Sequence, residues 1–188
     1  MNKKWVVVLV IVGAIAVAGL GGIRAYNNLV GLNVGIDASW AQVENVLQRR
    51  YDLIPNLVNT VKGYAKQEKT VLEEVTRLRS QWGAAKTPAD KIQAAQGLEG
   101  ALSRLMVVVE KYPDLKSNQN FLALQDELAG TENRIAVERM RYNETVRSYN
   151  VAVQRFPASV VARLGGFQKR DEYFEAEKGA AEAPKVEF

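Results

Sequence analysis

The chain has 188 residues, with 25 Lys and Arg, 21 Asp and Glu, and a formal net charge of +4. It contains no cysteine and no histidine, which excludes disulfides, thiol nucleophiles, Cys/His zinc sites, haem ligation by histidine and the commonest general base. The modest positive charge is not gathered into a basic block with interleaved aromatic residues, so we expect no nucleic-acid binding.

A single long apolar run, residues 5–23, follows a short cap of residues 1–4. About 19 residues of helix span about 28 Å, which is enough to cross the core of a bilayer. We interpret the run, from Trp5 to Ile23, as a transmembrane anchor. The alternative is a cleaved secretory signal, since Ala16-Val17-Ala18 has an A-x-A pattern, but the run exceeds the roughly 7–15 apolar residues of a signal.

The cations around the run predict its orientation. Lys3 and Lys4 precede it, and Arg24 is followed by no Lys or Arg until Arg49. The positive-inside rule therefore places the N-terminus in the cytoplasm and the soluble domain outside, at a bacterial inner membrane. The run also carries small residues at a spacing of four: Ala14, Ala18 and Gly22. Such a stripe suits either close packing of two anchors or plain lipid exposure.

Residues 24–157 have the pattern of an all-α, antiparallel up-and-down bundle of three to four long helices. Between residues 26 and 84 apolar positions recur mostly every three or four residues, which is typical of one buried helical stripe. Pro55 interrupts this stripe, and we expect a kink or break near Leu53-Ile54.

The later helices have clear local boundaries. Thr87, Pro88 and Asp90 predict the start of a second helix, which we expect to run to about Tyr112 and to stop at Pro113. A third helix is expected to begin near Ser117 or Asn118, to keep a seven-residue apolar rhythm through Phe156, and to end at Pro157. The tail, residues 158–188, is compatible with one short helix over 159–164, which Gly165-Gly166 ends.

The carboxylates do not form a catalytic pattern. Glu73 and Glu74 are adjacent and point about 100° apart on a helix, and a di-metal bundle site would need histidines that the chain lacks. Charges spaced by three or four, as in Arg134 to Arg147, suit a solvated face. No motif places a Ser–Lys dyad. We expect no enzyme activity, catalytic residue, metal, cofactor or small-molecule substrate.

The densest polar cluster in the sequence surrounds Pro55, and we take it as the candidate partner site. One interpretation is a structural kink; the other is a docking elbow, since Arg and Tyr are favoured at interface hot spots. The candidate residues are Arg49, Arg50, Tyr51, Asp52, Pro55 and Asn56. Val186 and Phe188 place apolar side chains at the last position and two positions before it, an arrangement that a PDZ-type groove binds. A third interpretation, a ligand-binding bundle, rests on the tyrosines Tyr51, Tyr64, Tyr112, Tyr142 and Tyr149.

Several motifs together resemble the LemA family over nearly the whole chain. They include Trp40-Ala-Gln-Val43, Arg49 to Leu57, Tyr112-Pro-Asp-Leu-Lys116, Asn120 to Glu127, Gly130 to Ala136, Arg155-Phe-Pro157 and Tyr173-Phe-Glu-Ala176. The segment Glu138-Arg-Met140 departs from the more basic run that relatives carry.

The resemblance implies an N-terminal membrane helix, an antiparallel helical bundle and no established enzymatic activity. One relative takes part in magnetosome membrane biogenesis, and others occur alongside membrane metalloproteases, which favours a scaffold that associates with itself or another membrane protein. An adaptor of such a partner, bound through its C-terminal tail, is the alternative. The family's N-terminus has been described as extracellular, opposite to the orientation that Lys3 and Lys4 predict.

Overall fold

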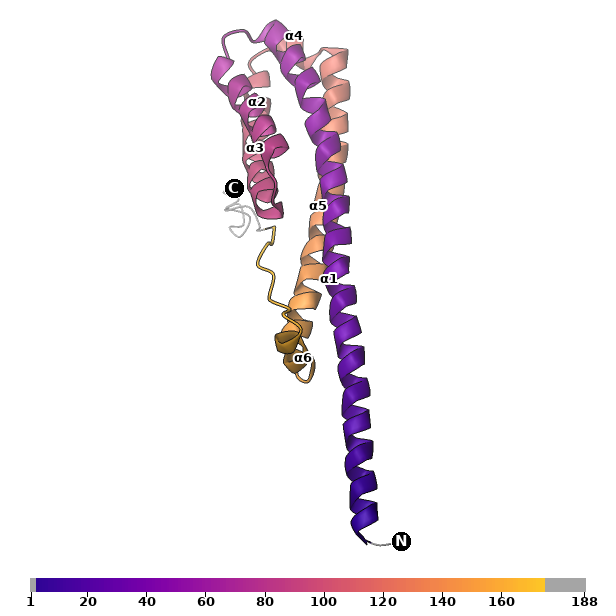
Figure 1. Cartoon of the computed structure of the whole chain (residues 1–188). Helices are drawn as coiled ribbons and strands as arrows, with labels where there is room; N and C mark the ends of the chain where they lie inside the picture. The colour runs from indigo at the N-terminus through magenta and orange to yellow at the C-terminus, as the bar shows by residue number, and fades with distance from the viewer. Residues whose placement is uncertain (1–2, 175–188) are drawn as a thin grey trace, which may run out of the picture. The chain divides into compact units, whose positions relative to one another are not determined.

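The computed structural model describes residues 3–174, and every regular element within that range is an α-helix. In chain order these are α1 (Lys3–Tyr64), α2 (Lys69–Ala84), α3 (Pro88–Val109), α4 (Pro113–Lys116), α5 (Gln119–Gln154) and α6 (Ala158–Leu164), labelled in Figure 1. The prediction of an all-α fold with a long apolar N-terminal helix is therefore confirmed.

The described residues divide into two compact units. Residues 3–42 and 140–171 form the first unit, and residues 43–139 and 172–174 form the second. Helices α1 and α5 each contribute residues to both units.

In the first unit, α1 is exposed over the apolar stretch and becomes buried only beyond it. No part of its most apolar window is buried, whereas Leu29 and Ile36 are core residues. Trp40 packs edge-on against Tyr142 of α5, with ring centroids 5.5 Å apart. A Cβ on Gly35 would lie 3.6 Å from Thr145 of α5, so the two helices approach closely here.

In the second unit, one stripe of each helix faces a common core. The buried apolar side chains of α1 recur every three or four residues, as amphipathic helices require. They are Val43, Leu47, Tyr51, Ile54, Leu57 and Val61. Helices α2 and α3 pack against each other. Their buried side chains are Leu72, Val75, Leu78 and Trp82 of α2 and Leu98, Leu102 and Leu105 of α3.

The sequence predicts a kink or break near Leu53-Ile54, and the structure has no break there. Pro55 lies inside α1, which continues to Tyr64 before the chain turns into α2. A proline in a helix leaves the carbonyl four residues earlier without its N–H donor, and here that carbonyl belongs to Tyr51. The Arg79 Nε of α2 donates a hydrogen bond to this oxygen at 3.2 Å. A neighbouring helix therefore supplies a donor to the carbonyl that the proline leaves without one.

The helical pattern expected over 26–84 is interrupted between Tyr64 and Lys69, and the helix expected to reach about Tyr112 ends at Val109. The starts of the later helices agree with the predictions. Thr87 caps α3, accepting a hydrogen bond from the Asp90 N–H at 3.1 Å. Asn118 accepts one from the Phe121 N–H at 3.1 Å at the start of α5. Pro113 follows the end of the second predicted helix, as expected, and it is also the first residue of the short helix α4.

The seven-residue apolar rhythm fails at its last position. The rhythm places Phe156 on the buried seam, but this side chain is 78% exposed. Helix α5 ends at Gln154, so Phe156 lies beyond it and helical periodicity no longer sets the direction of its side chain. The short helix expected at 159–164 is α6, and Gly166, two residues after its end, has a positive φ of 74°.

Candidate functional site

The residues around Pro55 point in different directions from α1. Arg50 and Tyr51 are buried, whereas Arg49, Asp52 and Asn56 are exposed. Arg49 pairs with Glu127 of α5 at 3.1 Å, with about half of each side chain exposed, and Asp52 accepts a hydrogen bond from Gln48 at 2.7 Å. The segment therefore combines a structural inner face with a polar outer face.

The inner face is built around Tyr51. Its ring stacks on Trp82 of α2, with centroids 4.2 Å apart and planes 13° from parallel. The Lys91 ammonium lies 5.1 Å from the centre of the Trp82 ring and also pairs with Glu44. Burial raises the pKa of Tyr51 above its ordinary value, against the opposing charges of Arg50 and Arg139. This tyrosine is therefore neutral at physiological pH and acts as a packing element.

Beside Tyr51 lies a set of four charged side chains that we call the Arg–Glu cluster: Arg50, Glu99, Glu132 and Arg139. Arg50 pairs with Glu132, and Arg139 pairs with Glu99 at 3.0 Å. Glu99 and Glu132 also influence each other's pKa.

The environment separates the pKa values of the two glutamates. Burial, together with the hydrogen bond and charge of Glu99, raises the pKa of Glu132 despite the opposing Arg50 charge. Burial also acts to raise the pKa of Glu99, but Arg139, the hydrogen bond with Glu132 and the Arg50 charge lower it overall. Of the two glutamates, Glu132 is therefore the one that is protonated first as the pH falls.

Several donors around the cluster have no acceptor among the described residues. They are Arg50 Nε, Tyr51 OH, Trp82 Nε1 and Arg139 Nε, all buried.

Most of this arrangement cannot be anticipated from spacing. The cluster brings together α1, α3 and α5, and Arg50 and Glu132 are 82 residues apart. The only local signal is the position of Arg50, in step with the buried stripe of α1. Other charges keep the expected surface role, such as the exposed pair of Arg147 with Glu144 at 2.7 Å.

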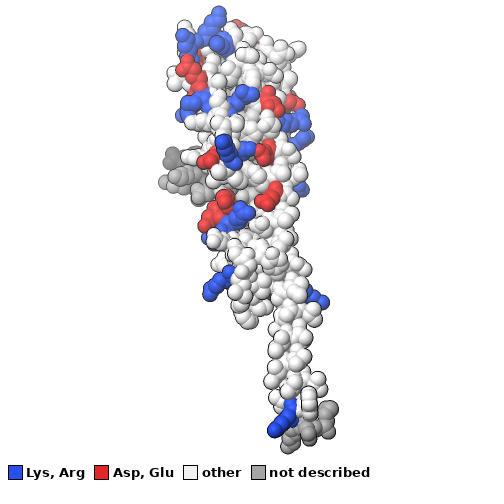
Figure 2. All heavy atoms as spheres, viewed as in Figure 1, with Lys and Arg blue, Asp and Glu red and all other residues white. Residues whose placement is uncertain are grey.

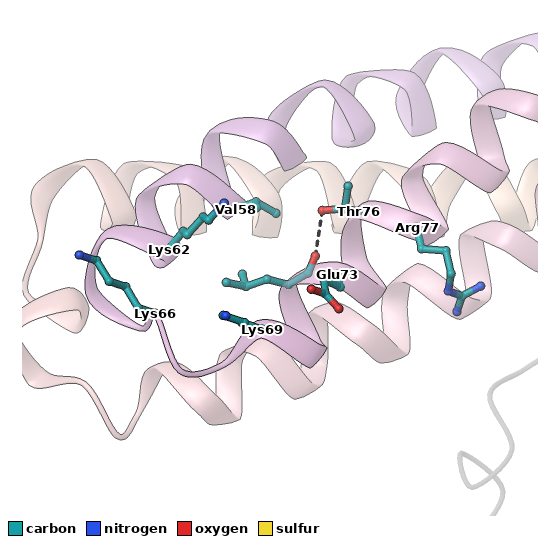
Figure 3. Close-up of a pocket in the computed structure, with 8 residues that line it drawn as sticks. Val58, Lys62, Lys66, Lys69, Glu73, Thr76 and Arg77 are labelled. Carbon is teal, nitrogen blue, oxygen red and sulfur yellow. Dashed lines mark hydrogen bonds between the residues drawn. The ribbon is translucent and has the colours of Figure 1, made fainter.

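A basic groove lies in the second unit, where α1 ends and α2 begins. Its volume is about 650 Å³, and Val58 and Leu72 give it an apolar floor. Glu73 also lines the groove, and Figure 3 shows its carboxylate between Lys69 and Arg77. Four cations line the groove as well, and none of them forms an ion pair among the described residues. They are Lys62, Lys66, Lys69 and Arg77. Asn56 lines a separate shallow hollow with Leu53 and Glu127.

The other predicted site residues have simple positions. Trp5 and Ile23 are exposed on α1, as are Ala14 and Ala18, whereas Gly22 is half-buried. Val186 and Phe188 lie outside the described residues. Of the five tyrosines, Tyr51, Tyr142 and Tyr149 are buried core side chains, Tyr112 is half-buried, and Tyr64 is exposed.

Comparison with known proteins identifies the family. The sequence pattern of the LemA family matches residues 39–188. The chain is 30% identical over 187 residues to the magnetosome protein MamQ of Magnetospirillum gryphiswaldense, an alignment that covers 86% of this chain and 68% of that protein. It is 28% identical over 144 residues to protein LemA of Metamycoplasma hominis, covering 74% of this chain and 62% of that one. The chain belongs to the LemA family.

Proposed function

We propose that the protein is a non-enzymatic scaffold held at a membrane by the apolar part of α1. The observation that carries the membrane attachment is that no residue in the most apolar window of that stretch is buried. Trp5, Val10 and Ile15 are each about two thirds exposed, although burial of such side chains is strongly favourable in water. Figure 2 shows the same stretch as a narrow surface of uncharged residues. A bilayer is the environment that suits it.

The organisation and orientation of the scaffold follow from the same anchor. We place a short cap at 1–4, the anchor at 5–23, the helical bundle at 24–157 and a tail at 158–188. The cations Lys3 and Lys4 favour a cytoplasmic N-terminus and an extracytoplasmic bundle. The exposed Arg49, Asp52 and Asn56 are the surface that we propose for contact with a second copy or another membrane protein.

Anchoring is tested by placing charge in the exposed apolar stretch. Arginine near the middle of a membrane helix costs about 2.5–3.5 kcal/mol, so Val10→Arg with Ile15→Arg is expected to release the full-length protein from membranes on alkaline carbonate extraction. The matched control is Met140→Arg with Val107→Arg. These side chains are 66% and 67% exposed, as are Val10 and Ile15, but they lie outside the anchor. Equal extraction of both double variants would contradict anchoring.

The scaffold role is tested by crosslinking in intact membranes followed by mass spectrometry. Crosslinks between copies of the chain that decrease when Arg49, Asp52 and Asn56 are changed to Ala support a self-assembling scaffold. A control variant carries Ser103→Ala and Gln93→Ala, at other exposed positions of the second unit. Crosslinks that respond to neither variant would contradict the proposed surface.

The basic groove favours a second candidate, an adaptor that binds an acidic segment of another membrane protein. Its lining combines four cations and one carboxylate, Glu73, with the apolar Val58 and Leu72. The excess of positive charge beside apolar side chains suits a peptide that alternates acidic and apolar side chains. The C-terminal residues Val186 and Phe188 are the other proposed contact in this adaptor role. Two variants separate these contacts in a pull-down from solubilised membranes. Deletion of residues 186–188 removes the C-terminal contact, and the double variant Lys62→Glu with Lys69→Glu reverses charge in the groove. An unchanged set of partners in both variants would refute the adaptor.

A further inference from the structure

The first unit exposes a second apolar surface, away from the anchor sequence. We call it the α6 patch: Phe156, Val160 and Leu164, which are 78%, 52% and 85% exposed. Val160 and Leu164 are four residues apart and therefore share one face of α6. Ala162, on another face of α6, is buried. The helix is thus packed against the protein on one side and presents large apolar side chains to its surroundings on another.

The α6 patch lies at the level where the anchor ends. Phe167, just after α6, packs edge-on against Tyr26 with ring centroids 5.5 Å apart, and its N–H donates to the Ala162 carbonyl at 2.9 Å. Tyr26 is three residues beyond Ile23, or about 4.5 Å along the helix axis. Figure 1 shows α6 beside this part of α1.

Hydrogen bonds hold the segment after α6 in this position. The Tyr149 hydroxyl donates to the Gln168 carbonyl at 2.9 Å. The Asn150 side chain both donates to the Arg170 carbonyl at 2.7 Å and accepts from its N–H at 2.9 Å. The Arg170 guanidinium donates to Asn33 of α1 at 3.1 Å. The patch is therefore carried by a braced segment of the first unit.

The charge around the patch suits an anionic membrane surface. Residues 145–170 contain no Asp or Glu. Arg155 and Arg163 are exposed next to the patch, and Arg24 is exposed immediately after the anchor. Long cationic side chains beside apolar ones are typical of helices that lie in the bilayer interface, with the charge at the headgroups.

We infer that the α6 patch is a second membrane contact. Phe156, Val160 and Leu164 enter the boundary between headgroups and acyl chains, and Arg155 and Arg163 bind anionic phospholipid headgroups. This inference rests on the proposed membrane anchoring, because the position of the patch is measured from the end of the anchor.

The absence of cysteine makes a direct depth measurement practical. Single variants Leu164→Cys, Ile11→Cys and Met140→Cys of the full chain would each carry a nitroxide label in vesicles of phosphatidylcholine and phosphatidylglycerol. Collisions of the label with oxygen, which concentrates in lipid, and with a water-soluble nickel chelate would be measured by electron paramagnetic resonance. Ile11 reports the anchor, and Met140 is an exposed control on α5 of the same unit.

The expected ratio of oxygen to nickel collisions is highest at Ile11, intermediate at Leu164 and lowest at Met140. A high ratio at Ile11 with equal ratios at Leu164 and Met140 would overturn the α6 inference alone. Low ratios at all three positions would overturn the anchoring. A Leu164 label shielded from both reagents would mean that protein covers the patch, which also overturns lipid contact.

The arginines are tested in the same system. The double variant Arg155→Gln with Arg163→Gln is combined with Leu164→Cys or with Ile11→Cys. It is expected to lower the ratio of oxygen to nickel collisions at Leu164 and to leave that ratio unchanged at Ile11. The same loss is expected when phosphatidylglycerol is omitted. A Leu164 ratio that responds to neither change would refute recognition of anionic headgroups.

Discussion

The hydrogen bond between Arg79 and the Tyr51 carbonyl allows a quantitative test of why α1 passes through Pro55. Loss of the donor in Arg79→Ala leaves a buried carbonyl without a partner, at a cost of about 1–3 kcal/mol. Arg79 is itself exposed, which reduces the strength of the bond, so we expect a loss of about 1 kcal/mol at the low end of this range. For a chain of this length, that corresponds to a decrease of roughly 2–4 °C in the midpoint of thermal unfolding.

The same reasoning predicts a coupling with Pro55. Proline in a helix interior costs about 3 kcal/mol relative to alanine, and the Arg79 bond offsets about 1 kcal/mol of this. Pro55→Ala is therefore expected to stabilise the protein by about 2 kcal/mol, since the alanine would supply its own N–H to the Tyr51 carbonyl. In that background Arg79→Ala should cost less than about 0.5 kcal/mol.

The wild type, Arg79→Ala, Pro55→Ala and the double variant form a double-mutant cycle. The stability of each full-length protein is measured by thermal unfolding in detergent micelles, followed by far-ultraviolet circular dichroism. Arg77→Ala is the matched control, because Arg77 lies exposed on the same helix without an acidic partner among the described residues. Equal costs of Arg79→Ala in the wild type and in the Pro55→Ala background would refute the idea that Arg79 acts through the freed carbonyl.

Three further predictions concern the second unit. The pKa of Glu132 is raised in the folded protein above its ordinary value of 4.5, so protonated Glu132 stabilises the fold below pH 4.5 and this stabilisation is lost as the pH rises through the folded pKa. The Glu132→Gln variant should therefore lose less stability than the wild type between pH 4.5 and about pH 7. An identical dependence of stability on pH in the two proteins would contradict the shift. Thr87→Ala should destabilise by about 1 kcal/mol in thermal unfolding through loss of the α3 cap, whereas Thr87→Ser should not. Trp82→Ala should cost about 3–5 kcal/mol and abolish the near-ultraviolet signal of the Tyr51 stack, whereas a loss below about 1 kcal/mol would argue against a packed core here.

Local chemistry is enough to predict most helix boundaries. The Thr87 cap, the Asn118 cap and the end of α5 before Pro157 depend on residues within one helical turn of each boundary. The buried stripe of α1 also follows from spacing alone, because one face of a helix repeats every three or four residues.

The rest depends on contacts that are distant in sequence. The effect of Pro55 could not be predicted because its compensating donor, Arg79, lies on another helix. The Arg–Glu cluster escapes prediction for the same reason, since spacing along one helix does not reveal a partner 82 residues away. The sequence groups Arg50 with its exposed neighbours as a partner residue, yet its own side chain is only 10% exposed.

The three tryptophans occupy three different surroundings, and this gives the protein built-in optical reporters. Trp5 is 66% exposed in the apolar stretch, Trp40 packs against Tyr142 in the first unit, and Trp82 stacks on Tyr51 in the second. Replacing two of them with phenylalanine would leave one fluorophore whose emission reports a single region. The order in which the two units lose structure during denaturation can therefore be followed without attaching a dye.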